Sequence, residues 1–278
     1  MRATQGNPPP DAQKGLKQSL ISQNYFLGCV CTPDDFMDIV LPDSEAFRST
    51  TTVMDIAPLN DSVIRLRLRR PENFHYFSGQ YVTIYKEDHV GRSFSLASVP
   101  VMDDFLEFHI QVIPDGTVSS WIKQAVSPDD SITIGEAMGS CIYTGGNPAQ
   151  PLVLIGTGTG LAPLYGIVRT ALSSKHTGDI MLYHGSRHAD NLYLQDALNR
   201  IAEEHTNFRY IPCLSGPESA PGTRHGRAND LALNDIAKFA GWRAFLCGNP
   251  SMVNASKRAL FLAGVSMQDI HADPFSHA

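Results

Sequence analysis

A glycine-rich loop in the second half of the chain is the strongest candidate for a ligand site. It follows a short apolar run at 151–155 (PLVLI), which predicts a buried strand, and it precedes a pattern of helical period. The loop consists of Gly156, Thr157, Gly158, Thr159 and Gly160. Glycines let the backbone pass close to a ligand, and a helix start offers unpaired N–H groups and the positive end of a dipole. This arrangement suits a pyrophosphate.

The loop departs from the strict dinucleotide fingerprint, because Leu161 occupies the position of the third glycine. Pro163 fits the first turn of the helix, where its missing N–H costs nothing. Taken alone, the same residues could form a tight strand-to-helix turn that binds no ligand.

A second group of candidate residues lies in a β-like stretch. It consists of Arg92, Ser93, Phe94, Ser95, Leu96, Ala97 and Ser98. An arginine can hold a phosphate through two hydrogen bonds, and an aromatic ring can stack on a planar group. On its own this pattern is equally compatible with an ordinary strand that carries a surface arginine.

A third candidate, Phe245 to Met252, lies at the end of a predicted buried strand. Cys247 and Gly248 end the strand, and Asn249-Pro250 opens a helix. Ligands of parallel sheets bind at the carboxyl ends of the strands. The alternative is that Cys247 is a small buried filler of the core.

The pattern of apolar residues, and with it the predicted secondary structure, changes between these groups. From about 50 to 147, short alternating strands are separated by turn signals, which predicts an antiparallel barrel. Arg65, Arg67 and Arg69 alternate with apolar residues and form either a solvated strand face or a docking stripe. After Asn147-Pro148, apolar strands alternate with helices, which predicts a parallel sheet with helices on both faces.

Composition excludes several classes of protein. The chain has 278 residues and a net charge of -6, which argues against nucleic acid or an anionic membrane as the main partner. No run of apolar residues is long enough for a transmembrane helix, and the polar, proline-rich start does not resemble a signal peptide, so we expect a cytoplasmic protein. The five scattered cysteines predict reduced thiols, and we expect residues 1–18 to be mobile.

The three groups, in this order, resemble the ferredoxin–NADP reductase superfamily, and specifically the reductase components of bacterial multicomponent oxygenases. The resemblance extends from about residue 50 to the end of the chain. It implies an antiparallel Greek-key β-barrel that binds FAD, followed by a Rossmann-like parallel sheet that binds NAD(P). The expected boundaries are 1–48 for an N-terminal segment, 49–147 for the FAD domain and 148–278 for the NAD(P) domain.

The resemblance also implies roles for individual residues. Arg92 would hold the FAD pyrophosphate, with Ser93 beside it, Phe94 would lie against the flavin, and Ser95 would approach flavin N5. The family more often has Tyr at Phe94, so one hydroxyl contact is missing here. The strand beside the flavin would be His109, Ile110, Gln111 and Val112, and a second pyrophosphate contact would come from Gly116, Thr117, Val118 and Ser119.

For the nicotinamide nucleotide, the resemblance implies contacts from Thr157 to Pro163 and from Cys247, Gly248, Pro250 and Met252. The Cys247 thiol would shape the nicotinamide pocket. Asp273 and Phe275 match the family's C-terminal acid and aromatic near the flavin. Ser95, Cys247 and Asp273 are the expected catalytic residues.

Preference between NADH and NADPH would be set by the turn that contains Ser186 and Arg187. Both side chains could hold a 2′-phosphate. Asp190 is the nearest acidic residue in the sequence, and no acidic residue directly adjoins the turn. The resemblance to oxygenase reductases that use NADH favours NADH slightly.

The N-terminal segment resembles the last third of a plant-type ferredoxin domain, with Cys29 at the position of the fourth cluster ligand. Residues 25–41 are expected to form a strand, a turn and a second strand. The family's first three cluster ligands have no counterpart, and a cluster of this kind needs four thiolates. We therefore expect no iron–sulfur cluster and no other metal.

Three functions fit the sequence. The first is an NAD(P)H-dependent FAD reductase that passes electrons to a separate protein, either a ferredoxin or an oxygenase component. The second is a reductase of free flavins, quinones or ferric complexes. The third is a non-catalytic flavin-binding module, which the intact Cys247-Gly248 segment disfavours.

Overall fold

The computed structural model describes residues 1–16, 18–33, 35–40 and 48–275. It divides into two compact units, Met1–Arg48 and Ser49–Ala278, which are described separately. In the described residues, no helix is both long and apolar enough to cross a membrane.

The first unit is small and contains two short strands that pair antiparallel. Its elements are β1 (Arg2–Gln5), α1 (Pro10–Gln13), α2 (Gln18–Ile21) and β2 (Asp38–Val40). Ala3, Ala12 and Phe26 form its core. Of the strand, turn and strand expected at 25–41, the second strand is present as β2, whereas the first is not, since Tyr25 makes only an isolated bridge to Arg2. Strand β2 pairs with β1, and positions 34 and 41 lie outside the described residues. Residues 1–18 hold β1 and α1, although polar composition alone suggested a mobile tail.

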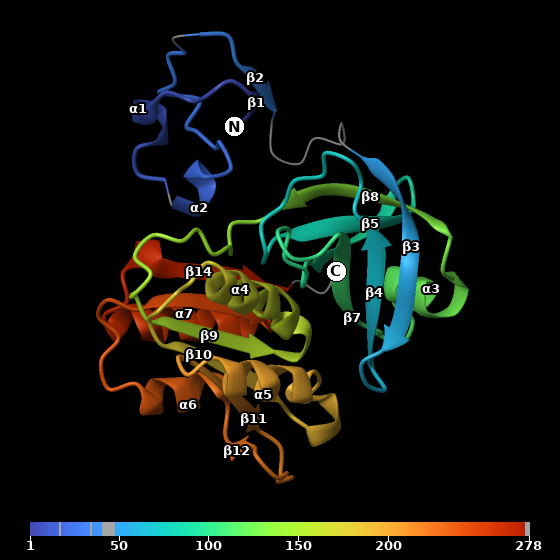
Figure 1. Ribbon diagram of the computed structural model, residues 1–278, viewed down its shortest axis with the longest axis vertical. Helices are drawn as coiled ribbons and strands as arrows, with labels where there is room; N and C mark the ends of the chain where they lie inside the picture. The colour runs from blue at the N-terminus through green and yellow to red at the C-terminus, as the bar shows by residue number, and fades with distance from the viewer. Residues whose placement is uncertain (17, 34, 41–47, 276–278) are drawn as a thin grey trace. The chain divides into compact units, whose positions relative to one another are not determined.

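The second unit begins with a six-stranded antiparallel barrel, as expected (Figure 1). Its elements are β3 (Ser49–Pro58), β4 (Val63–Arg69), β5 (Tyr81–Glu87), β6 (Val90–Ser95), β7 (Phe105–Gln111), α3 (Thr117–Ala125) and β8 (Ser131–Met138). The strand order is β6-β5-β8-β3-β4-β7, and a bridge between Leu96 and Phe108 connects the two edges. Leu66, Leu68 and their neighbours on alternate positions fill the barrel core, as the period of two predicted.

The arginines of β4 point out of that core, and two of them are neutralised within the sheet. Arg65 contacts Asp55 at 2.7 Å, and Arg67 contacts Glu107 at 2.6 Å. These ion pairs favour the interpretation of a strand face that is balanced within the barrel over that of a basic docking stripe.

The remaining chain forms a parallel six-stranded sheet with helices on both faces, as predicted (Figure 1). Its elements are β9 (Leu152–Thr157), a 3-10 turn η1 (Gly158–Gly160), α4 (Leu161–Ser173), β10 (Ile180–Ser186), η2 (Ala189–Asn191), α5 (Gln195–Glu204), β11 (Phe208–Leu214), β12 (Arg224–His225), α6 (Ala228–Asp235), β13 (Arg243–Gly248), α7 (Pro250–Leu262), η3 (Met267–Asp269) and β14 (Ile270–Pro274). The strand order is β12-β11-β10-β9-β13-β14. Helices α4 and α5 pack into one apolar cluster and α6 and α7 into another, on the two faces of the sheet.

This order fixes where a ligand can bind. From the central strand β9 the chain runs outward through β10 and β11 and then returns to β13 on the other side. The loops after β9 and β13 run in opposite directions, and this opens a crevice at the carboxyl ends of these two strands. The glycine-rich loop and Cys247-Gly248 both lie at this crevice.

Candidate active site

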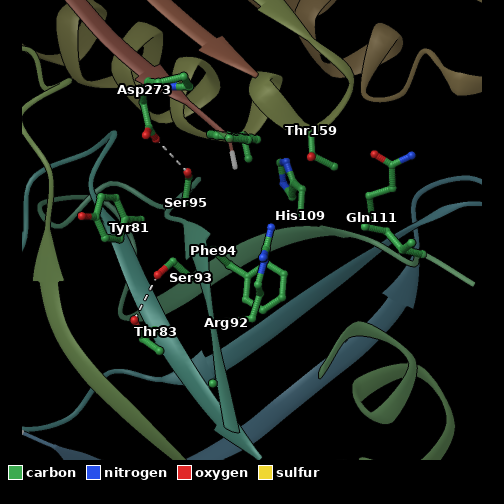
Figure 2. Close-up of a pocket in the computed structure, with 15 residues that line it drawn as sticks. Tyr81, Thr83, Arg92, Ser93, Phe94, Ser95, His109, Gln111, Thr159 and Asp273 are labelled. Carbon is green, nitrogen blue, oxygen red and sulfur yellow. Dashed lines mark hydrogen bonds between the residues drawn. The ribbon is translucent and has the colours of Figure 1, made fainter. Parts of the chain in front are cut away.

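A cavity of about 520 Å³ lies between the barrel and the carboxyl edge of the parallel sheet (Figure 2). That volume is within the usual range for small-molecule and cofactor sites. Its wall combines β5 and β6, the end of β7, the start of α4 and the end of the chain. The lining residues are Tyr81, Thr83, Gly91, Arg92, Ser93, Phe94, Ser95, His109, Gln111, Ile113, Thr159, Ala162, Asp273, Pro274 and Phe275.

The pairing of β5 with β6 places the second group of candidate residues, Arg92 to Ser95, in the cavity wall. Ser95 lies opposite Tyr81 and Ser93 lies opposite Thr83, so their side chains share one face of the sheet. The hydroxyls of Thr83 and Ser93 are 3.0 Å apart. Sequence reasoning missed Tyr81 and Thr83. Tyr81 and Thr83 alternate along β5 and so lie on one face of it, but the sequence could assign that face to the cavity only once the register with β6 was known.

Ser95 meets a carboxylate from the far end of the chain. Its hydroxyl donates to Asp273 Oδ2 at 3.3 Å (Figure 2). Burial raises the pKa of Asp273 to about 6, and the hydrogen bond from Ser95 only partly opposes this shift. A carboxyl that changes its protonation state near neutral pH therefore stands beside a hydroxyl at the cavity wall.

The glycine loop packs directly against the Cys247-Gly248 turn. A Cβ on Gly160 would lie 2.3 Å from the carbonyl oxygen of Cys247, and Gly248 has a φ of +115° with Thr157 close to its missing Cβ. Both positions therefore require glycine. Thr157 accepts a hydrogen bond from the Asn249 N–H at 3.1 Å, which holds the two turns together. In this way the sequence brings the ends of β9 and β13 together into one surface.

Cys247 is completely buried and does not line the cavity. Its thiol lies 3.6 Å from that of Cys141, which follows the last barrel strand. Burial, followed by the contact with Cys141, raises the pKa of Cys247 well above its usual range. The thiol is therefore protonated at neutral pH and is suited to shaping a pocket, not to nucleophilic attack.

His109 belongs to a buried polar chain that sequence reasoning did not predict. Its Nε2 lies 3.1 Å from Glu107, and its Nδ1 lies 3.3 Å from the Tyr193 hydroxyl. Burial works against ionisation of Glu107, but contacts with His109 and Arg67 prevail and lower its pKa to about 2. No spacing rule links residues 109 and 193, so their contact could be found only from the fold.

The start of α3 provides a second group of backbone donors near the cavity. Gly116 precedes the helix, and no side chain caps its first N–H groups. A Cβ on Gly116 would lie 2.7 Å from Ser119 Oγ, which itself accepts from the N–H of the cavity residue Ile113. The side chain of Val118 is buried in the barrel core, so only its backbone is free to meet a ligand.

The turn after β10 has an acidic neighbour that the sequence did not reveal. Glu218 contacts His188 Nδ1 at 2.9 Å and accepts from the Ala189 N–H at 3.3 Å. The expectation that no acidic residue adjoins this turn is therefore wrong, because the loop after β11 brings Glu218 back to it. Ser186 bonds to the His188 carbonyl, and the Arg187 side chain is exposed.

The structure thus divides the expected site residues into two sets. Those that line the cavity are Arg92, Ser93, Phe94, Ser95, His109, Gln111, Thr159, Asp273 and Phe275. Those that lie outside it are Ile110, Val112, Gly116, Thr117, Val118, Ser119, Thr157, Gly158, Gly160, Pro163, Ser186, Arg187, Cys247, Gly248, Pro250 and Met252. Several of the second set lie at the crevice of the parallel sheet or at the start of α3, while the side chain of Ile110 is buried in the barrel core.

The sequence matches two domain families. Residues 48–155 match an FAD-binding domain, and residues 154–258 match an oxidoreductase NAD-binding domain. The ferredoxin–NAD(P)+ reductase component of the naphthalene 1,2-dioxygenase system of Pseudomonas putida is 33% identical over 280 residues, covering 99% of this chain and 85% of the relative. The chain belongs to the ferredoxin–NAD(P)+ reductase family. It is an NAD(P)H-dependent FAD oxidoreductase.

Two further relatives agree with this assignment. The aromatic O-demethylase reductase subunit of Amycolatopsis is 35% identical over 233 residues, covering 82% of this chain and 70% of the relative. The crystal structure of an Amycolatopsis cytochrome P450 reductase has a TM-score of 0.77 and 30% identity, covering 99% of this chain and 86% of that one. A ferredoxin NADP+ reductase from Neisseria gonorrhoeae, solved with FAD and NADP, has a TM-score of 0.72 at 21% identity and supports the fold alone.

Proposed function

We propose that this reductase binds the FAD ring system in the cavity and accepts reducing equivalents from NAD(P)H at the adjoining crevice. It then passes electrons to a separate protein, either a ferredoxin or an oxygenase component. The convergence of Arg92, Ser95, Thr159 and Asp273 on one cavity carries the proposal, because it joins both domains and the end of the chain.

The residues present fit a flavin nucleotide. Arg92 offers a guanidinium for a pyrophosphate, and the uncapped start of α3 offers backbone N–H groups for the same charge. Phe94 supplies an aromatic face. When bound, the flavin supplies the chemistry, taking up a hydride from the nicotinamide and releasing electrons to the acceptor.

The chain's own residues would orient that reaction. Ser95 has one hydroxyl proton, which it donates to Asp273 in this structure and would turn to the reacting edge of the flavin. Asp273 in its protonated form would then donate to the Ser95 oxygen and hold the hydroxyl in place. The surface formed by the glycine loop and Cys247-Gly248 would position the nicotinamide nucleotide. Holding two rings in a reactive geometry accounts for a large part of the acceleration in such transfers.

The relatives support the choice of acceptor. The Pseudomonas putida relative is a reductase component of a dioxygenase system, and the terephthalate 1,2-dioxygenase reductases of Comamonas are 28% and 27% identical. We propose the same division of labour here, in the cytoplasm where the reduced nicotinamide nucleotides are supplied.

An anaerobic titration of the purified protein with NADH and with NADPH, followed by visible absorbance, tests the proposal. We expect loss of the oxidised flavin bands with at least one nucleotide, and cytochrome c reduction that depends on added ferredoxin. A flavin that neither nucleotide reduces would refute the proposed chemistry. Rapid cytochrome c reduction without ferredoxin, together with reduction of free flavins or quinones at a similar rate, would instead support a reductase of free flavins, quinones or ferric complexes.

A further inference from the structure

Helix α4 connects the nucleotide loop to the flavin-binding barrel along one of its faces. Ala162 in its first turn lines the cavity. Gly166, one turn later, lets the helix approach the segment that follows β6, since a Cβ there would lie 3.2 Å from the Ala97 carbonyl oxygen. Arg169 and Thr170 follow on the same face after a further turn. One helix therefore contacts both the cavity and the barrel.

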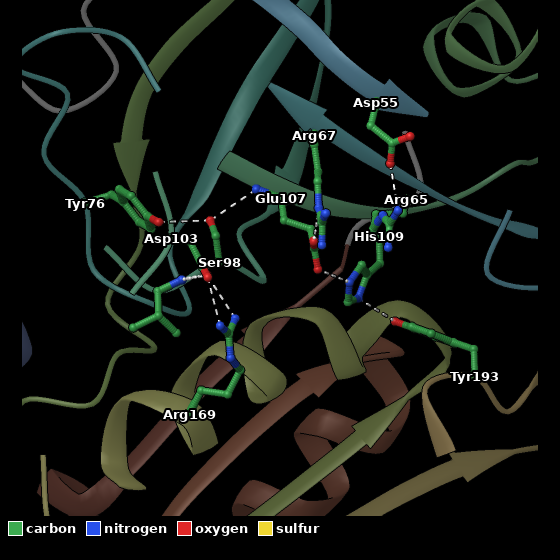
Figure 3. Close-up of polar contacts among 11 residues, drawn as sticks. Asp55, Arg65, Arg67, Tyr76, Ser98, Asp103, Glu107, His109, Arg169 and Tyr193 are labelled. Atoms are coloured by element: carbon green, nitrogen blue, oxygen red, sulfur yellow. Dashed lines mark hydrogen bonds and ion pairs between the residues drawn. The ribbon is translucent and has the colours of Figure 1, made fainter. Parts of the chain in front are cut away.

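The strongest contact of that face is an ion pair between the domains. The Arg169 guanidinium makes two hydrogen bonds to Asp103, of 2.9 and 2.8 Å (Figure 3). Both side chains are largely buried, with exposed fractions of 19% and 9%. A bidentate pair of this kind fixes both distance and orientation, because two parallel bonds tolerate little rotation.

Asp103 is itself held rigidly to the flavin-binding segment. Its carboxylate accepts from the Val99 N–H at 2.7 Å, and its own N–H donates to the Val99 carbonyl. Val99 directly follows the segment Arg92–Ser98, whose first four residues line the cavity. A change in the position of Asp103 is therefore transmitted to Val99 through these two hydrogen bonds, and from Val99 to the end of β6 through four residues of backbone.

A second link runs beside the first. Thr170 donates to Ser78 at 2.7 Å, and Ser78 donates to the Ser98 carbonyl at 3.3 Å. Ser98 also accepts from the Tyr76 hydroxyl at 2.9 Å (Figure 3). The turn from Ser98 to Asp103 is thus attached to α4 at both of its ends.

We propose that Asp103 and Arg169 form an alignment clamp for the reaction. The clamp holds α4, and with it the glycine-rich nucleotide loop, at a fixed position against the flavin-binding segment. It thereby sets the separation of the two rings during hydride transfer. Neither residue lines the cavity, so both are positioning residues. The inference rests on the proposed placement of the flavin and the nicotinamide.

The clamp predicts a loss of rate without a loss of nucleotide affinity. Asp103→Asn keeps an acceptor for the Val99 N–H but removes the charge. Arg169→Met keeps an unbranched side chain but removes the guanidinium, which pairs with Asp103 and lies over the Tyr165 ring. In anaerobic stopped-flow mixing of the FAD-loaded protein with NADH, we expect the limiting rate of flavin reduction to fall roughly 10-fold in each variant, because small misplacements of reacting groups are costly. The dissociation constant for NADH should stay within about twofold, since the nucleotide contacts themselves are unchanged.

Three further variants separate the clamp from general damage. The double variant should be no slower than either single one, because both changes break the same pair. Arg169→Lys, which keeps the charge and loses the paired geometry, should give an intermediate rate and supplies the same test if Asp103→Asn loses its flavin. Asp55→Asn is the matched control, since it breaks an arginine–aspartate pair of 2.7 Å that lies within the barrel.

Hydrogen–deuterium exchange gives a readout that does not depend on activity. Amides of α4 and of Val99–Asp103 should exchange faster in Asp103→Asn and Arg169→Met than in the wild type, and Asp55→Asn should leave them unchanged. The clamp would be overturned if both clamp variants reduced flavin at the wild-type rate, or if Asp55→Asn lost as much of that rate as they do. It would also be overturned if the double variant lost rate by the product of the two single losses. A wild-type flavin that neither NADH nor NADPH reduces would instead refute the proposed function.

Discussion

Ser95 on β6 donates a hydrogen bond to Asp273 on β14, a residue 178 positions later in the chain. The bond joins the barrel to the last strand of the parallel sheet. It places a hydroxyl and a carboxyl of raised pKa at the cavity wall, where the proposed chemistry occurs. The reacting end of the proposed flavin site is therefore complete only when the barrel and β14 are folded together.

Ser95→Ala should slow flavin reduction strongly. The variant loses the hydroxyl that would contact the reacting edge of the flavin, and we expect the limiting rate to fall roughly 10- to 1000-fold, or about 1.4–4 kcal/mol of transition-state stabilisation. The rate of Cys247→Ala should fall in the same range, because the buried thiol packs against Cys141 and supports the backbone of the proposed nicotinamide site. Stopped-flow absorbance measures both. Ser127→Ala, an exposed serine at a barrel turn, serves as the control, and unchanged rates in both test variants would contradict the assigned roles.

Ionisation of Asp273 should cost stability as the pH rises. Burial raises its pKa from 3.8 to about 6, so the folded protein binds this proton more tightly than the unfolded chain does. The favourable contribution is complete below pH 4 and is lost as the pH rises through 6, by up to roughly 3 kcal/mol. Urea unfolding of wild type and Asp273→Asn at equal flavin content should show the wild type losing stability relative to the variant between pH 4 and 7. Parallel curves would show that the carboxyl is not buried as described.

The regular parts of the fold were predictable because they depend on local patterns. The period of two in β4 and the apolar run of β9 reflect burial on one face or on both, which a single sequence displays. Strands β12 and β14 escaped prediction because they are short and partly polar, and pairing with β11 and β13 makes them strands.

The site was predictable only where it follows a motif. Arg92, Ser95 and Thr159 belong to contiguous segments and do line the cavity. The contacts of His109 with Tyr193, and of His188 with Glu218, join residues whose separation in the sequence follows no rule. Such pairs arise from crossover connections, which set the neighbours of a side chain without leaving any local signal.

The cysteines should differ sharply in their reactivity. Cys29 is exposed, whereas Cys141 and Cys247 are buried and the Cys247 pKa is raised. Because the thiolate is the reactive form, brief treatment with iodoacetamide at pH 7.5 should label Cys29 and leave Cys141 and Cys247 unmodified. Peptide mass spectrometry measures the labelling, and unfolding in urea should expose all five thiols. Labelling of Cys247 as fast as Cys29 in the folded protein would contradict the burial.

This chain should not hold an iron–sulfur cluster. Its first unit carries Cys29 and Cys31, which is two thiolates fewer than a cluster of the plant ferredoxin type requires. An iron assay after anaerobic purification should therefore give well under one iron per chain. About two irons per chain, with the matching visible absorbance, would overturn this prediction.

Glu218 should favour NADH over NADPH. It lies beside the turn of Ser186 and Arg187, where a 2′-phosphate would bind, and its contact with His188 lowers its pKa, so it is ionised at neutral pH. A carboxylate there repels a phosphate and can accept from a ribose hydroxyl. Glu218→Gln should therefore raise kcat/KM for NADPH, by about three- to tenfold at low salt because both partners are half exposed and screened by solvent.

The ratio of kcat/KM for the two nucleotides measures this effect. Glu203→Gln removes the same charge from an exposed position on α5 and should leave the ratio unchanged, which separates a local contact from a change in net charge. The effect of Glu218→Gln should shrink as salt is added, because salt screens the repulsion between the carboxylate and the 2′-phosphate that the substitution removes. An unchanged ratio in Glu218→Gln, or an equal change in Glu203→Gln, would assign the nucleotide preference to Arg187 and Ser186 alone.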